Sequence, residues 1–150
     1  MQIRYKTTAV FLAVVFLFMA DRWLKSLAMA GFSREIIGYL LVFDFSKNFG
    51  IAFSLPFPGH LLPILVGSII LILTHFARLA YLQQDFFLVS AYVLIIGGSI
   101  SNLFDRLRYG FVVDYLEVAY FSILNVADMM IFCGVLWLLI LFHKKRPTTG

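Results

Sequence analysis

The sequence predicts an all-α membrane protein in which four helices cross the bilayer. Its 150 residues are 62% hydrophobic and only 13% charged, whereas a soluble domain is about 45–50% apolar and about 25% charged. Too few polar residues remain to cover a water-soluble core of this size. Four separate stretches are long and apolar enough to span the hydrocarbon layer, which takes about 20 helical residues. We therefore expect one membrane domain over residues 1–150.

The four predicted helices are apolar in their middles and end at polar residues. Residues 9–20 of the first contain no polar side chain. Pro63 falls in the first turn of the second helix, where a missing N–H costs little, and the fourth ends in a basic run at residues 143–146. Because lipid offers no hydrogen-bond partner for irregular backbone, we expect complete helices over about 8–28, 60–81, 86–104 and 123–142.

The N-terminal stretch also has features of a cleaved signal peptide. Arg4 and Lys6 precede a short apolar run, and residues 28–30 resemble a small-residue cleavage site. The charges of Asp21 and Lys25 would be unusual immediately before such a site. We therefore interpret this stretch as the first membrane helix.

The number of basic residues does not determine the orientation of the chain in the membrane, because six of them fall on each side of it. The clusters at the two ends of the chain favour cytoplasmic termini. Two long connections, residues 30–59 and 105–122, then face the outside. The two sets are Arg4, Lys6, Arg78, Lys144, Lys145 and Arg146 on the inner side, and Arg22, Lys25, Arg34, Lys47, Arg106 and Arg108 on the outer side.

The first outer connection has a strand-like pattern from Phe43 onward. A period of two indicates extended backbone, so we expect a small strand-like cradle on the outer side, between the first two helices. Its aromatic face suits the membrane interface, and its small polar face suits the wall of a groove. The aromatic face comprises Phe43, Phe45, Phe49, Ile51 and Phe53, with Lys47 interrupting it, and the polar face comprises Asp44, Ser46, Asn48, Gly50, Ala52 and Ser54.

Polar residues that could carry chemistry gather around the third and fourth helices. Ionisable groups near the bilayer are costly, so each is a candidate functional residue. Asn102, Asp105 and Arg106 share a helical face at spacings of three and four, and Arg106 can pair with Asp105. Gly97 and Ser101 have a spacing that lets helices pack closely.

Asp114 and Asp128 are the candidate catalytic pair. Asp114 lies in the second outer connection, and Asp128 lies on one face with Asn125 at the start of the fourth helix. Two carboxylates held close together cannot both ionise easily, so one keeps its proton. The ionised group can then take a proton from water while the protonated group polarises a scissile carbonyl.

Simpler roles are compatible with the same residues. Asp128 can complement the dipole of a helix N-terminus, and Asp114 can be a solvated loop acid. Asp105 is more often a structural ion-pair partner than a catalytic group. Asp21 and Lys25, at a spacing of four, are expected to pair where the first helix leaves the bilayer.

Other kinds of site are disfavoured by composition. A single cysteine, Cys133, excludes a disulfide within the chain, and it lies in a helix without a nearby base. The three histidines are dispersed, so we expect no metal site. The net charge of +4 includes no basic stretch long enough to follow nucleic acid.

Five segments in order resemble the lipoprotein signal peptidase (signal peptidase II) family, and the resemblance covers nearly the whole chain. Three positions depart from the family pattern, namely Ile51, Ser101 and Leu124, where alanine, glycine and an aromatic residue are usual. Ile51 and Ser101 put substrate preference in question. The five segments are Asp21 with Lys25; Asn48, Gly50, Ala52 and Phe53; Gly98, Asn102, Asp105 and Arg106; Val113-Asp114; and Asn125-Val126-Ala127-Asp128.

The resemblance implies an aspartic endopeptidase of the bacterial inner membrane, with its active site near the periplasmic face and no cofactor or metal. The implied substrate is a prolipoprotein with diacylglyceryl on a cysteine, which is cut just before that cysteine. Membrane lipids and globomycin-type cyclic peptides are further implied partners. By resemblance, Asp114 and Asp128 form the catalytic dyad; Asn48, Gly50, Asn102, Arg106 and Asn125 position substrate or dyad; and Asp21, Lys25, Gly98, Asp105 and Ala127 are structural.

Two other functional classes fit an acidic membrane protein. A non-catalytic lipid or lipoprotein carrier derived from the same family would be expected to lack a dyad residue, and both are present. A proton-coupled transporter would be expected to have broken helices or an internal repeat, and the sequence has neither pattern.

Overall fold

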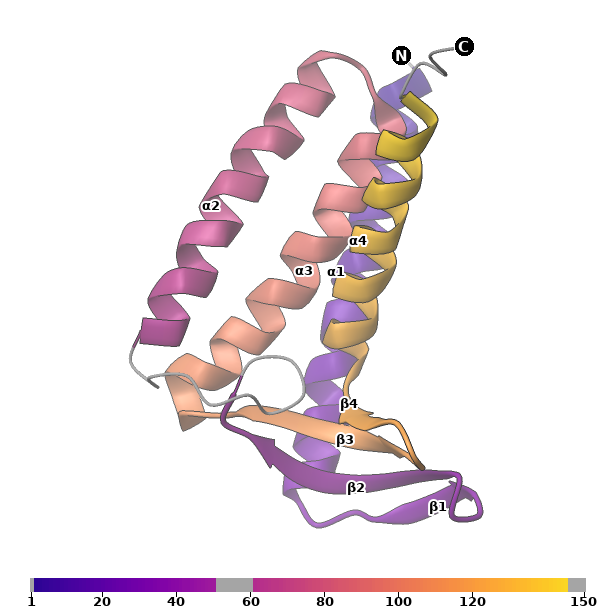
Figure 1. Cartoon of the computed structure of the whole chain (residues 1–150), viewed down its shortest axis with the longest axis vertical. Coiled ribbons are helices and arrows are strands. Elements are labelled where there is room, and N and C mark those ends of the chain that lie inside the picture. The colour runs from indigo at the N-terminus through magenta and orange to yellow at the C-terminus, as the bar shows by residue number, and fades with distance from the viewer. Residues whose placement is uncertain (1, 51–60, 146–150) are drawn as a thin grey trace.

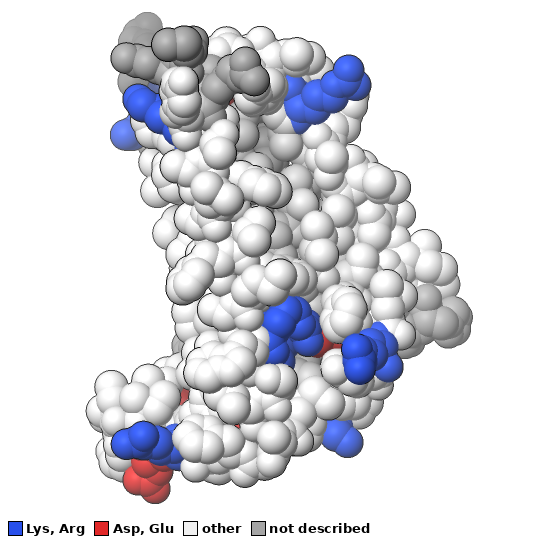
Figure 2. Space-filling view, turned by 180° about the vertical axis from the view of Figure 1, so that it is seen from behind, with Lys and Arg blue, Asp and Glu red and all other residues white. Residues whose placement is uncertain are grey.

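Four long helices stand on a small sheet in the computed structural model, which describes residues 2–50 and 61–145. The start of α1 and the end of α4 lie together at the end of the molecule away from the sheet (Figure 1). Each helix is long and apolar enough to cross a membrane, and Figure 2 shows an uncharged band between charged ends. The expected four-helix membrane fold is confirmed. The helices are α1 (Gln2–Met29), α2 (Leu61–Leu82), α3 (Phe86–Tyr109) and α4 (Val126–Lys145).

Helix α3 is the centre of the bundle and packs against the other three helices. Its small residues allow this, because a side chain on Gly97 would meet Val14 of α1 and Met130 of α4. Gly98 lies against the backbone carbonyl of Ala127. This close approach of α3 and α4 brings polar residues near the sheet end of both helices together.

Replacement of Gly98 by alanine is expected to destabilise the fold by about 1–3 kcal/mol, the usual cost of overpacking a close contact. The new Cβ would overlap the Ala127 carbonyl oxygen. Gly67→Ala in α2 is the matched control, because no atom lies within 4 Å of a Cβ there, and its effect should be neutral or stabilising. Unfolding in mixed micelles measures both, and equal stability of the two variants would contradict the packing argument.

The sheet joins the two connections at one end of the bundle. Its strands are antiparallel in the order β1 (Arg34–Ile37), β2 (Leu41–Asn48), β3 (Val112–Val118) and β4 (Ser122–Leu124). The central pairing of β2 with β3 sets Ser46 opposite Asp114. Only half of the sheet therefore comes from the connection between α1 and α2, where the whole cradle was expected.

The expected alternation along the first connection is also only partly right. A bulge between Phe43 and Ser46 shifts the register of β2 against β3. The expected aromatic face is also unevenly buried, because Phe43 is buried while Phe49 is 64% exposed. The described strand ends at Asn48. The remaining positions of the expected strand, including the departure at Ile51, lie outside the described residues.

Helices α1 and α4 extend beyond the expected ranges at the chain ends, to Gln2 and Lys145. Two further helix boundaries differ because their neighbours have structure of their own. Helix α3 continues beyond residue 104 to Tyr109 and is closed by Gly110 in the left-handed conformation. Helix α4 begins only at Val126, because residues 122–124 pair with β3. The chain between α3 and α4 is therefore mostly sheet, and Asp114 is a strand residue.

Candidate active site

Asp114 and Asp128 are joined by the side chain of one residue, Asn125. The Asn125 amide donates a 2.6 Å hydrogen bond to Oδ1 of Asp114. The amide oxygen accepts a 2.8 Å bond from the backbone N–H of Asp128, and the backbone N–H of Asn125 donates to Asp128 Oδ2 at 3.3 Å. This reciprocal pattern at the start of a helix resembles a capping box. It ties the strand that carries one acid to the helix that carries the other.

Asn102 of α3 adds a second link to the pair. Its amide donates to Asp128 Oδ1 at 2.7 Å, and its oxygen accepts a 2.9 Å bond from Nζ of Lys25. Because both its donor and its acceptor are engaged, the amide has a fixed orientation. Asp128 is thereby held by α3 as well as by the backbone of its own helix.

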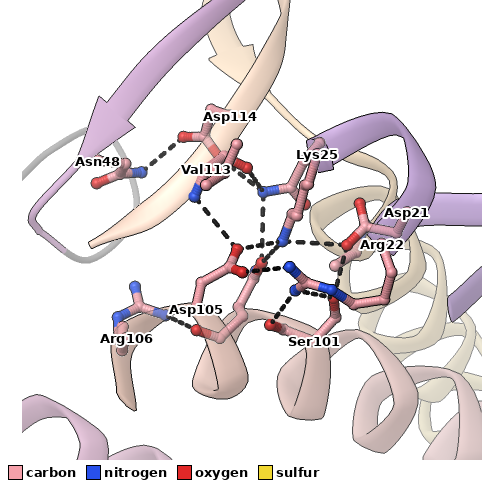
Figure 3. A network of polar contacts seen from close by, with 12 residues as sticks. Asp21, Arg22, Lys25, Asn48, Ser101, Asp105, Arg106, Val113 and Asp114 are labelled. Atoms are coloured by element: carbon pink, nitrogen blue, oxygen red, sulfur yellow. Dashed lines mark hydrogen bonds and ion pairs between the residues drawn. The ribbon is translucent and has the colours of Figure 1, made fainter. Parts of the chain in front are cut away.

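Asn48 and Gly50, at the end of β2, flank Asp114 from the other side. The Asn48 amide donates to Asp114 Oδ2 at 3.0 Å (Figure 3), and its oxygen accepts from the backbone N–H of Gly50 at 3.1 Å. The guanidinium of Arg106 donates to the Gly50 carbonyl at 2.9 Å and to the Asn102 carbonyl at 3.3 Å. All of the sequence-predicted positioning residues therefore meet around the two acids.

The environment of Asp114 makes the ionised form of its carboxyl group less favourable than it is in water. Burial, followed by the negative charge of Asp128, raises the pKa of Asp114 from about 3.8 to about 6. The bonds from Asn48 and Asn125 act in the opposite direction. Asp114 borders a pocket of about 240 Å³. The rest of the pocket wall comes from β2 and from the segment around β4, namely Ser46, Lys47, Asn48, Phe121, Ser122 and Ile123.

A charge cluster that is buried except for part of Arg22 lies beneath this site (Figure 3). Lys25 Nζ pairs with Asp21 at 3.0 Å, as expected, and with Asp105 at 2.7 Å. Asp105 also pairs with Arg22 at 2.6 Å and accepts from the backbone N–H of Val113 at 3.2 Å. The cluster binds α1 to α3 and to the strand of Asp114. The expected pairing of Asp105 with Arg106 is wrong, since Arg22 and Lys25 of α1 take that role.

The sequence did not predict the place of three residues in this network: Tyr115, Ser101 and Arg22. Tyr115, next to Asp114, donates to Asp21 at 2.9 Å and accepts from the backbone N–H of Val126 at 3.0 Å. Ser101 donates to Asp21 at 2.6 Å, and Arg22 donates to Ser101. No alternation along β3 marks Tyr115, because residues 112–115 are all buried.

The fold and the paired acids define a polytopic membrane protein with a candidate acid–base site at one end of its helices. The model of the family described as signal peptidase (SPase) II matches residues 13–144. The chain therefore belongs to the signal peptidase II family, and it is a bacterial multi-pass membrane protease.

Relatives from diverse bacteria carry the same name. The chain is 35% identical to the lipoprotein signal peptidase of Shewanella loihica over 91% of its length and 88% of that protein. It is 33% identical to that of Syntrophomonas wolfei, over 91% and 93%. In fold it is similar to a bacterial membrane enzyme solved in meso at 2.3 Å resolution, with a TM-score of 0.83, 24% identity, and coverage of 95% of this chain and 92% of that one.

Proposed function

We propose that this protein removes the signal peptide from diacylglyceryl-modified prolipoproteins, with Asp114 and Asp128 as its catalytic dyad. The observation that carries the proposal is the Asn125 side chain, which links both carboxyl-bearing residues next to a pocket. Relatives named lipoprotein signal peptidase support the substrate class.

The dyad cleaves by activating water, without a covalent intermediate. The ionised carboxylate accepts a proton as the water oxygen attacks the scissile carbonyl carbon. The protonated partner hydrogen-bonds the carbonyl oxygen, where negative charge develops. The tetrahedral intermediate then collapses, the C–N bond breaks, and a dyad proton passes to the leaving amine. The single proton at rest belongs to the pair, because strongly coupled acids titrate together.

The neighbouring amides and Arg106 position the reacting groups. Asn102 and Asn125 hold Asp128 in one orientation. Arg106 fixes the backbone carbonyl of Gly50, so the chain beyond β2 leaves the site in a defined direction. The role of these residues is geometric, and small displacements of catalytic groups are costly.

The site faces the outside of the cell in this proposal, and the termini are cytoplasmic. The sheet lies at the end of the helices away from the chain ends (Figure 1). Asp114 belongs to β3 of that sheet, and Asp128 lies in the first turn of α4, which follows β4. The lipid of the substrate stays in the outer leaflet while the peptide reaches the dyad. Globomycin-type cyclic peptides are expected to bind at the same pocket in competition with substrate.

Cleavage of a lipidated preprotein by the purified protein tests the proposed function. We expect signal-peptide release from a diacylglyceryl-modified preprotein, with the new N-terminus at the modified cysteine by mass spectrometry. The same preprotein with that cysteine changed to serine is the matched substrate control. No cleavage would favour the non-catalytic carrier, and equal cleavage of both substrates would contradict lipid recognition.

The pH dependence of cleavage is expected to move when Asn48 is removed. The mechanism needs one proton on the dyad, so kcat/KM falls as the pH rises through the pKa at which that proton leaves. Asn48 donates to the ionised form of Asp114 and lowers its pKa. Asn48→Ala should move the alkaline limb upward by up to about one unit, since one unit is about 1.4 kcal/mol. Ser46→Ala, in the same pocket wall, should leave the limb in place, and a downward shift in Asn48→Ala would contradict the mechanism.

A further inference from the structure

A second pocket lies away from the dyad, between the sheet ends of α1 and α3. It has a volume of about 340 Å³, and none of its lining residues borders the Asp114 pocket. Two arginines and three aromatic residues face it: Arg22, Arg108, Phe18, Phe104 and Tyr109. The proposed cleavage reaction leaves this pocket without a role.

The pocket carries one positive charge that no acid balances. Arg22 is already paired with Asp105 at 2.6 Å. Arg108 is exposed and lies over the rings of Phe104 and Tyr109, at 5.9 and 5.4 Å from their centroids. Arg22 lies over the Phe104 ring at 4.8 Å, so two guanidinium groups flank one ring. Within the part of the chain that the structure describes, no carboxylate lies within ion-pair distance of Arg108.

In each of the two helices, the arginine of the lining lies nearer the sheet end than the phenylalanine. Arg108 is next to the end of α3 at Tyr109, and Phe104 lies one turn deeper. On α1, Arg22 and Phe18 are spaced by four residues, with Phe18 the deeper. Trp23 is 62% exposed beside Arg22, which is typical of the membrane interface. On the face seen in Figure 2, basic side chains gather at the sheet end of the uncharged band.

We propose that this pocket binds an anionic phospholipid. Its phosphate lies between Arg22 and Arg108, and its first acyl chain follows Phe104 and Phe18 toward the bilayer centre. Guanidinium groups are the preferred partners of phosphate oxygens. The uncompensated charge of Arg108 selects an anionic headgroup, because a zwitterionic lipid would bring an ammonium group to a pocket whose lining has no carboxylate.

Lipid binding to the full-length protein tests this inference independently of cleavage. Native mass spectrometry in neutral detergent, with dioleoylphosphatidylglycerol or dioleoylphosphatidylethanolamine as the probe, should give tighter binding of phosphatidylglycerol. Arg108→Gln should weaken phosphatidylglycerol binding about fivefold, the effect of one basic residue near a charged lipid surface, and leave phosphatidylethanolamine unchanged. Arg108→Lys should retain most of the preference.

The matched control is Arg34→Gln, which removes another exposed arginine from the sheet end of the molecule. It should bind phosphatidylglycerol like wild type. Equal loss in Arg34→Gln, or no preference between the two lipids in wild type, would overturn the proposal. Inorganic phosphate at millimolar concentration should not displace the lipid, and displacement by phosphate would show that the acyl chain is not held.

Discussion

Asp114→Asn and Asp128→Asn are each expected to lower kcat/KM for the lipidated preprotein by at least about 10³-fold, within the range for loss of a general acid or base. Either change leaves only one group that can gain or lose a proton, so the pair can no longer act as acid and base together. The double variant should be little worse than each single one, because groups that act as a unit are not additive. Quantified signal-peptide release under single-turnover conditions measures all three.

The control for this prediction is Asp44→Asn, which changes an exposed acid of β2 in the same way. It should cleave at the wild-type rate. Thermal unfolding of each variant separates loss of chemistry from loss of fold. A dyad variant that is folded and cleaves within about tenfold of wild type would be inconsistent with general acid–base catalysis by that residue.

The helices could be predicted from the sequence because the bilayer imposes a length and an apolar composition on each of them. The sheet was harder to predict, since β2 and β3 are about 70 residues apart in the chain and strand pairing depends on both partners. Alternation was visible from Phe43 onward. In contrast, Val112, Val113, Asp114 and Tyr115 are all buried, so β3 has no alternation of polar and apolar residues.

The residues of the candidate site could be predicted from the sequence, but most of the hydrogen bonds and ion pairs between them could not. Residue types and order indicated Asp114, Asp128 and Asn125, and the structure brings them together. The partner of Asp105 could not be inferred, because the nearest arginine in sequence, Arg106, is directed to Gly50 instead. Ion pairs between helices depend on how the helices are rotated, and small residues such as Gly98 determine that rotation through close contacts.

Lys25→Met is expected to destabilise the protein by about 3–5 kcal/mol, the cost of removing one partner from a buried ion pair. Lys25 is fully buried and contacts Asp21, Asp105 and Asn102. Arg22 still compensates Asp105 after the change, but Asp21 loses its ammonium partner. Asn102 loses one of the two donors that orient its amide toward Asp128. Unfolding in mixed micelles measures the effect, and Lys144→Met, at an exposed lysine of α4, is the control.

Removal of the carboxylate as well distinguishes missing charge from missing packing. Methionine restores much of the lysine's apolar volume, so the remaining penalty is that of the uncompensated Asp21 carboxylate. The double variant Lys25→Met with Asp21→Asn should therefore recover part of the stability that Lys25→Met loses. A double variant no more stable than Lys25→Met would mean that packing dominates. The buried cluster would then contribute to the site as a spacer between α1, α3 and β3 rather than through its charges.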